Sequence, residues 1–221
     1  MYRTRLTVAV VALSLLSTSA IASTILPTVT GTAASNAAWP APPGTANHFH
    51  GAFVNAGEMG VEDERGLVEF NLSGESPFAA VLLTFANAPF QTCCPAGVSG
   101  GSYTIGVYAY AGNNALSFGD FDVPGTLLGS FSTAGMTIGT PFSFDVTAAF
   151  NANVGGSLGI RLQALTEPGQ TSYTFNNFTL DTAPVAAVPE PGTMLLLGMG
   201  LTGAVARYRC RIDRRPDRER S

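Results

Sequence analysis

Short runs in which apolar and polar residues alternate fill the middle of the chain, from about residue 35 to residue 181. In the run PFSFDVT, every second residue from Phe142 to Val146 is apolar. A period of two residues is typical of a β-strand that turns one face to a core, whereas an amphipathic helix repeats every 3.6 residues. No long stretch of this region has the helical period. The pattern therefore predicts an all-β domain.

The alternating runs predict about eight strands, which matches an antiparallel two-sheet sandwich or jelly roll. They cover residues 49–55, 66–72, 79–85, 102–110, 126–131, 141–147, 157–165 and 173–180. Glu69 and Arg161 are expected on the outer faces of their strands. Only residues 147–152 read as a short helix, which Gly155 and Gly156 would end.

The first 22 residues have the three-part layout of a secretory signal peptide. Arg3 and Arg5 precede an apolar stretch, and small residues close the segment at Ala20 and Ala22. The alternative is a buried N-terminal helix. A signal peptide predicts export into an oxidising compartment. Residues 23–44 are then expected as a linker, 45–181 as the β-sandwich domain and 182–187 as a second linker.

Residues 188–221 form a three-part C-terminal segment. Val188, Pro189, Glu190 and Pro191 come first, then an apolar run at 193–206, then an arginine-rich tail at 207–221. As a helix the apolar run is about 21 Å long, against a hydrocarbon core of about 30 Å. This length favours transient membrane insertion, and the arginines predict a cytoplasmic end. A plain C-terminal membrane anchor is the alternative.

This order of parts resembles the PEP-CTERM sorting signal of Gram-negative bacteria, whose motif corresponds to Val188, Pro189, Glu190 and Pro191. The resemblance implies that a membrane enzyme of the exosortase type is a partner and cuts at or near the motif. It also implies release to the cell surface or to an exopolysaccharide (biofilm) matrix. Two prolines suit such a site, because they keep the backbone extended and out of any helix.

A second resemblance lies in the domain itself. The runs at 64–72, 144–150 and 159–162 are similar to the bacterial DNRLRE-type domain, a jelly roll of the kind used by carbohydrate-binding modules. The resemblance implies polysaccharide binding by residues 45–181. In it, Arg65 is expected as an ion-pair partner of nearby acids, and Asp145 as a cap of the short helix.

Charge is distributed very unevenly along the chain. Of its 11 basic residues, only Arg65 and Arg161 lie between residues 23 and 191, together with twelve acids. This region therefore has a net charge of −10. Nucleic-acid binding depends on Lys and Arg that neutralise phosphates, so the sequence predicts no nucleic-acid partner.

Two groups of residues are candidate metal ligands. Asp120 and Asp122, with Asn113 upstream, supply loop oxygens of the type that Ca²⁺ prefers, so a structural calcium ion is the expected cofactor, if any. His48 and His50 are two residues apart, which on a strand puts both rings on one side, as for two ligands of one metal. No third ligand is identifiable. A solvated acidic loop and exposed polar residues at a strand start are the respective alternatives.

Aromatic and cysteine residues provide the remaining candidates. Tyr108, Tyr110 and Trp39 are candidates for stacking on sugar rings, whereas the simpler interpretation has the two tyrosines cover the second face of the sheet. Cys93 and Cys94 are adjacent, and a bond between them would close a strained ring. A vicinal disulfide is favoured over an intermolecular link and over free thiols, which stay open.

No motif predicts an enzyme. The chain has two histidines, no nucleophile elbow and no glycine-rich phosphate loop. The sequence predicts a non-catalytic exported surface or matrix protein that binds polysaccharide. One alternative is a structural or adhesive protein with no defined ligand. Another is a secreted glycan-active hydrolase that uses a pair of its acids.

Overall fold

The fold is built from antiparallel β-strands, as the alternating pattern predicts. The computed structural model describes residues 22–36, 45–59, 62–90, 101–166, 169 and 171–183, which all belong to one compact unit, Ala20–Val185. Its strands are β1 (Thr24–Ile25), β2 (Val29–Asn36), β3 (His48–Phe49), β4 (Val54–Met59), β5 (Glu62–Asn71), β6 (Ala80–Ala88), β7 (Thr104–Ala111), β8 (Thr126–Ser132), β9 (Pro141–Asp145), β10 (Ser157–Ala164) and β11 (Ser172–Ala183). Two helices, the 3₁₀ turn η1 (Phe118–Phe121) and α1 (Thr147–Ala152), complete the described elements.

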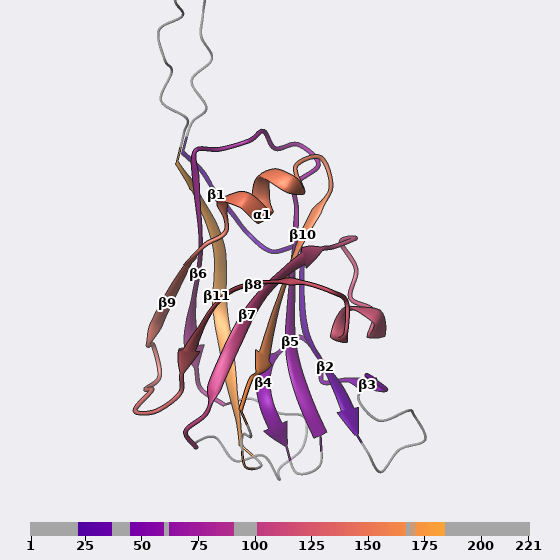
Figure 1. The fold of residues 1–221 in the computed structure, drawn as a ribbon, viewed down its shortest axis with the longest axis vertical. Helices are drawn as coiled ribbons and strands as arrows, with labels where there is room; N and C mark the ends of the chain where they lie inside the picture. Colours follow the sequence, from indigo (N-terminus) through magenta and orange to yellow (C-terminus); the bar gives the residue numbers. More distant parts are fainter. Residues whose placement is uncertain are drawn as a thin grey trace, which may run out of the picture. The chain divides into compact units, whose positions relative to one another are not determined.

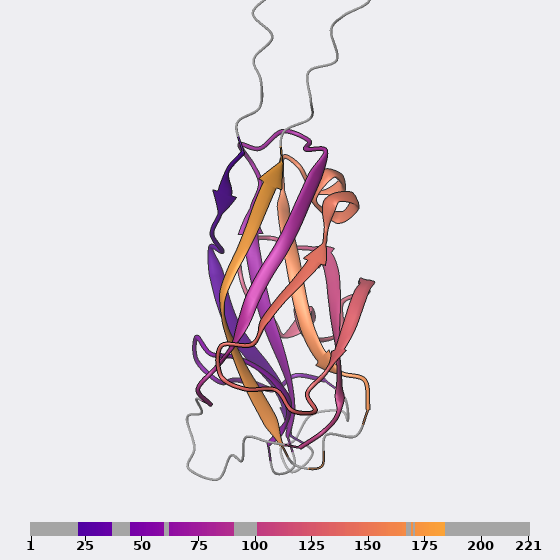
Figure 2. The same ribbon diagram turned by 90° about the vertical axis from the view of Figure 1, so that its left-hand side faces the viewer.

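The strands form one strongly curved sheet with the order β8-β7-β10-β5-β4-β11-β6-β9. β2 pairs with β5, β3 pairs with β2, and β1 pairs with β11. Figure 1 shows β9, β6 and β11 on one side of the domain and β5, β2 and β3 on the other, and Figure 2 shows the long strands following its long axis. The all-β sandwich or jelly-roll prediction is confirmed.

The larger of two hydrophobic clusters in the described residues lies between the two halves of the sheet, and Phe85 on β6 is at its aromatic centre. Its ring packs against several others, with centroids 4.9 to 6.0 Å away: Phe131, Phe142, Phe144, Phe175 and Phe178. The alternating residues predicted to point inward on β9 and β10 do so. Period-two patterning therefore placed the core residues correctly, because it depends only on which face of a strand is covered.

The N-terminal boundary of the domain differs from the prediction. Residues 24–36, expected as part of a linker, form β1 and β2, and β2 pairs with β5 along eight register positions from Val29↔Glu69 to Asn36↔Glu62. β2 consists mostly of small residues, and a Cβ on its Gly31 would lie 2.7 Å from Leu116 Cδ1. Close packing rather than bulky apolar side chains holds this strand, so it lacks the usual alternating signal. At the other end, β11 continues two residues past the expected boundary, to Ala183.

Glu69 and Arg161 lie on the outer faces of their strands, as predicted, but they are buried there. The segment from 112 to 123, which contains η1, covers the outer face of β5 and β10. Arg161 Nη1 donates to the carbonyl oxygens of Asp120 and Val123, at 3.2 and 2.7 Å. Glu69 Oε2 accepts from the Asn113 amide at 3.0 Å. Both charged groups thus anchor the covering segment.

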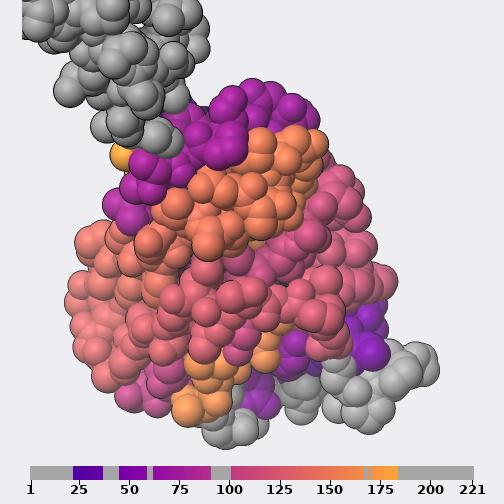
Figure 3. All heavy atoms as spheres, turned by 45° about the horizontal axis from the view of Figure 1, so that its top comes forward, coloured from indigo at the N-terminus to yellow at the C-terminus, as the bar shows by residue number. Residues whose placement is uncertain are grey.

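The short helix α1 has the predicted bounds, and Gly155 follows it with a φ of +82°. Asp145 Oδ1 accepts hydrogen bonds from the amide and hydroxyl of Thr147, the first residue of α1, at 2.9 and 2.6 Å. The N-cap position itself is Val146, one residue later than predicted, so Asp145 supports the start of the helix from just outside it. The loop that follows β5 lies against α1, as Figure 3 shows, and Asn151 hydrogen bonds to both the amide and the carbonyl of Phe78. These contacts close one end of the core.

Candidate functional site

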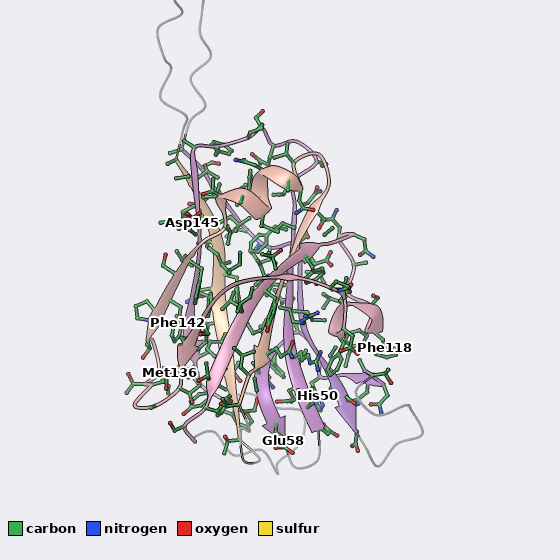
Figure 4. All side chains as sticks on the ribbon, in the orientation of Figure 1. His50, Glu58, Phe118, Met136, Phe142 and Asp145 are labelled. Atoms are coloured by element: carbon green, nitrogen blue, oxygen red, sulfur yellow. The ribbon has the colours of Figure 1, made fainter. Side chains whose placement is uncertain are left out.

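The two histidines lie beside a carboxylate from a different strand. His48 is the first residue of β3, His50 is the first residue after that strand, and Glu62 is the first residue of β5. β2 is their common neighbour, because Ala34 on β2 is the register partner of His48 and Asn36 is that of Glu62. The unpredicted strand β2 therefore brings together residues that are twelve or more positions apart in sequence. Figure 4 shows His50 in the lower part of the view, far from the end of the domain at which β1 lies.

Three potential ligand atoms of this cluster, which we call the His48–His50–Glu62 cluster, form a tight triangle. His50 Nε2 is 2.7 Å from Glu62 Oε2, His48 Nε2 is 3.2 Å from the same oxygen, and the two Nε2 atoms are 2.8 Å apart. The cluster is largely shielded from water, since the exposed side-chain fractions are 14%, 3% and 13%. Among the described residues it is the one group of three that brings ligand atoms of the metal-binding types within 4.8 Å of one another.

Two asparagines hold the cluster in place. Asn36 Nδ2 donates to Glu62 Oε1 at 2.7 Å, which leaves Oε2 turned to the histidines. Asn47 Oδ1 lies 2.6 Å from His48 Nδ1, and its amide nitrogen donates to the Asn36 carbonyl at 3.1 Å. Hydrogen-bond partners of this kind, placed behind the cluster residues, fix the orientation and tautomer of the groups that they contact.

The surroundings of Glu62 favour its ionised form. Partial burial alone would raise the pKa of Glu62, but interactions with Asn36, His48 and His50 outweigh burial and hold the pKa below its usual value. A carboxylate in this state offers lone pairs to a cation or to N–H donors.

A second carboxylate, that of Glu64, lies on the same face of β5 and is fully buried. Burial raises the pKa of Glu64, and interactions with Ser172, His50 and Asn55 only partly offset that rise. Its Oε2 atom has no hydrogen-bond partner among the residues that the structure describes. A buried oxygen without a partner is costly, so it calls for an explanation such as a bound ion or a chemical role.

The expected calcium ligands are engaged with protein donors. Asp120 Oδ2 accepts from the amide and hydroxyl of Ser117, at 2.6 and 3.0 Å, and so caps η1. Asp122 Oδ1 lies 2.7 Å from Arg65 Nη1, which confirms Arg65 as an ion-pair partner. The side chain of Asn113 accepts from the Ala115 amide at 2.9 Å. Calcium binding by these residues stays a prediction.

Of the expected sugar-stacking residues, Tyr110 is buried, so the prediction of an exposed ring is wrong at this position. Its hydroxyl donates to Glu69 Oε1 at 3.3 Å, and burial followed by the nearby charge of Glu69 raises the pKa of Tyr110. Tyr108 is half-buried, with the Arg161 guanidinium 5.2 Å from its ring centre. The tyrosines therefore contribute to the covered second face of the sheet, which was the simpler interpretation.

An exposed aromatic pair that no sequence pattern predicted lies next to the cluster. Phe49, between the two histidines, is 39% exposed, and Phe118 of η1 is 46% exposed. Their rings stack with centroids 4.7 Å apart and planes 20° apart. Figure 4 shows Phe118 on the same side of the domain as His50.

Several predicted features lie outside the described residues. They are the signal peptide (1–22, of which only residue 22 is described), Trp39, Cys93, Cys94, the motif Val188, Pro189, Glu190 and Pro191, and the apolar run and tail that follow it. Within the described residues, no helix has the length and apolar character needed to cross a membrane.

Fold and cluster together define a β-sandwich domain of the jelly-roll kind with a shielded histidine–carboxylate site. Comparison with protein families finds that residues 187–209 match the PEP-CTERM protein-sorting motif. The chain thus carries this sorting signal, which indicates an exported protein that is sorted to the cell envelope and recognised by exosortase.

Two further comparisons concern the whole chain. Among solved structures, a xylan-binding module, CBM15, is similar with a TM-score of 0.41 and 13% sequence identity, over 75% of this chain and 99% of that one. A comparison with curated proteins finds no match.

Proposed function

We propose that the protein is a non-catalytic polysaccharide-binding protein of the bacterial surface or extracellular matrix, released after exosortase-type processing at its Pro-Glu-Pro motif. The observation that carries the proposal is the sorting motif at residues 187–209. A sorting signal of this kind directs the protein that carries it out of the cytoplasm. Outside the cell, such a protein meets the polysaccharide of the surface and matrix.

The exposed Phe49–Phe118 pair supports the binding activity. Sugar rings have an apolar face of C–H groups, which packs on an aromatic face, while their hydroxyls need polar neighbours at the edge. Two neighbouring aromatic rings, 39% and 46% exposed, offer such a surface. The net charge of −10 over residues 23–191 favours a neutral polymer over a polyanion.

The processing step is tested by the intact mass of the protein from the extracellular fraction of its host. We expect a mass that lacks residues 1–22 and everything beyond the Pro-Glu-Pro motif. The double variant Pro189→Ala/Pro191→Ala should accumulate as the longer, membrane-retained precursor, and Glu75→Gln is its matched control outside the motif. A wild-type protein that keeps its arginine-rich tail in the membrane would contradict the proposal.

Binding is tested by pull-down of the processed protein on neutral polysaccharides such as xylan and cellulose and on the matrix polysaccharide of the host. We expect Phe49→Ala and Phe118→Ala each to weaken retention several-fold. Leu127→Ala is the matched control, since Leu127 is also exposed, at 51%, but lies on β8. Equal retention of all variants would exclude the aromatic pair, and release of reducing sugar would contradict the non-catalytic assignment.

A further inference from the structure

We propose that the His48–His50–Glu62 cluster binds a divalent transition-metal ion of the zinc class. The site is independent of the proposed export and polysaccharide binding. Its three potential ligand atoms are His48 Nε2, His50 Nε2 and Glu62 Oε2, which all lie within 4.8 Å of one another.

The types of ligand atom select the class of metal. Two imidazole nitrogens and one carboxylate oxygen are a common set for Zn²⁺ and its neighbours in the periodic table, whereas Ca²⁺ and Mg²⁺ prefer oxygen atoms alone. Ligand atoms at about 2.0–2.1 Å from one tetrahedral zinc ion are about 3.3 Å from each other. The observed separations of 2.7, 2.8 and 3.2 Å are slightly shorter, so small side-chain rotations suffice to admit an ion.

The hydrogen-bond network holds His48 in the tautomer that can bind a metal through Nε2. The Asn47 amide nitrogen donates to the Asn36 carbonyl, so its Oδ1 faces His48 Nδ1, 2.6 Å away. An oxygen at this distance requires a proton on Nδ1, and a neutral imidazole then has its lone pair on Nε2. That lone pair points into the cluster. Asn36 likewise occupies Glu62 Oε1 and leaves Oε2 for the ion.

One shared proton satisfies the three ligand atoms less well than a divalent metal ion would. If His50 carries its proton on Nε2, that proton faces two acceptors at once, His48 Nε2 at 2.8 Å and Glu62 Oε2 at 2.7 Å. A divalent ion would instead meet three lone pairs directly. The site is also well shielded, which strengthens the attraction between an ion and the carboxylate.

Glu64 is the second, independent observation. It is two residues from Glu62 on the same strand face and is fully buried. Its Oε2 lacks a hydrogen-bond partner among the described residues. A cation bound at the cluster would be an electrostatic partner for this oxygen that needs no proton donor. The buried acid therefore fits a site that is built for a positive ion.

A bound ion would cross-link two segments of the chain. It joins the segment after β3 to the start of β5, and so fixes the short strand β3, which pairs only through two register positions with β2. Three protein ligands leave a fourth tetrahedral position for water or for an external oxygen. The expected consequence is higher thermal stability of the metal-bound protein.

The test measures binding of Zn²⁺ alone to the full chain, purified in detergent and stripped with a chelator. We expect about one zinc ion per chain by elemental analysis after dialysis, a rise in Tm on adding Zn²⁺, and no such rise with Mg²⁺. With Co²⁺ in place of Zn²⁺, visible absorption bands of a tetrahedral nitrogen–oxygen site should appear. A chain that binds no zinc after stripping and reloading would overturn the proposal.

Variants locate the ion. His48→Gln, His50→Gln and Glu62→Gln should each lower zinc affinity by at least about tenfold and abolish the Tm rise. Glu75→Gln, in the loop after β5, is the matched carboxylate control and should bind zinc as the wild type does. The Tm of each variant without metal shows whether it is folded. Zinc retained in all three variants but lost in Cys93→Ser/Cys94→Ser would place the ion elsewhere and overturn the proposal.

Discussion

Gly159 on β10 lies directly under the ring of Tyr110 on β7, so closely that a Cβ on Gly159 would come within 3.0 Å of the ring carbons. The two residues are register partners in the antiparallel ladder of β7 and β10. The ring is buried at 3% exposure, and its hydroxyl reaches Glu69 on the next strand. One glycine therefore makes room for the tyrosine that joins three strands on the covered face of the sheet.

Replacement of Gly159 by alanine should destabilise the domain. The added methyl group must displace a buried aromatic ring or the backbone, and such overpacking costs about 1–3 kcal/mol. Urea unfolding of Gly159→Ala should show a midpoint well below that of the wild type. Gly74→Ala is the matched control, because nothing lies within 4 Å of a Cβ built there. Equal midpoints for both variants would refute the close packing.

Arg65 should contribute more to stability than either of its acidic partners. Its side chain is 13% exposed, pairs with Asp63 and Asp122 at 3.0 and 2.7 Å, donates to the Phe121 carbonyl and stacks on the Phe121 ring. We expect Arg65→Gln to lower the free energy of unfolding by about 1–3 kcal/mol. Asp122 is half exposed, so Asp122→Asn should cost less than about 1 kcal/mol. Denaturant titration of both variants measures the difference, and a larger loss in Asp122→Asn would contradict it.

Features that depend on local pattern were predictable from the sequence. Helix α1 has the predicted bounds, because a short run without strand-like alternation ends before two glycines, and most strands fall where residues alternate. Strand β2 was not predictable in this way, since it is held by small residues such as Gly31 that pack closely without a strong apolar signal.

Only the histidine pair of the candidate site was predictable from the sequence; its meeting with Glu62 was not. The spacing of His48 and His50 places both rings on one side of a strand, which is a local property. Their meeting with Glu62 depends on the register of β3 and β5 against β2, which no short-range pattern encodes. The burial of Glu69 and Arg161 has the same origin, because it requires the segment 112–123 to fold over strands that are distant in sequence.

Phe85 should be one of the most sensitive positions of the core. Its ring contacts five others and is 2% exposed, so Phe85→Ala removes a large volume where neighbours on β8, β9 and β11 cannot all collapse. We expect a loss of about 3–5 kcal/mol. Phe118→Ala, at a ring that is 46% exposed, should cost much less. Thermal unfolding of both variants checks the ranking, and similar Tm values would contradict the assignment of Phe85 to the core centre.

Asp145 should make the stability of the domain depend on pH in the acidic range. Hydrogen bonds from the Thr147 hydroxyl and then from the Thr147 amide lower the pKa of Asp145 below its usual value. An acid with a lowered pKa in the folded state stabilises the fold fully above its ordinary pKa, and this contribution is lost as the pH falls through the folded value. Asp145→Ala should therefore have a lower Tm than the wild type at pH 7, and the gap should shrink below a pH of about 4.

The variant Asp145→Asn separates charge from hydrogen bonding at this position. Asparagine keeps an oxygen that accepts from the Thr147 amide but does not ionise, so its Tm at pH 7 should lie between those of the wild type and Asp145→Ala. The Tm difference between Asp145→Asn and Asp145→Ala should not change between pH 7 and pH 3, because neither side chain titrates. A wild-type advantage that stays constant over the same pH range would show that the Asp145 carboxylate does not stabilise α1 through its charge.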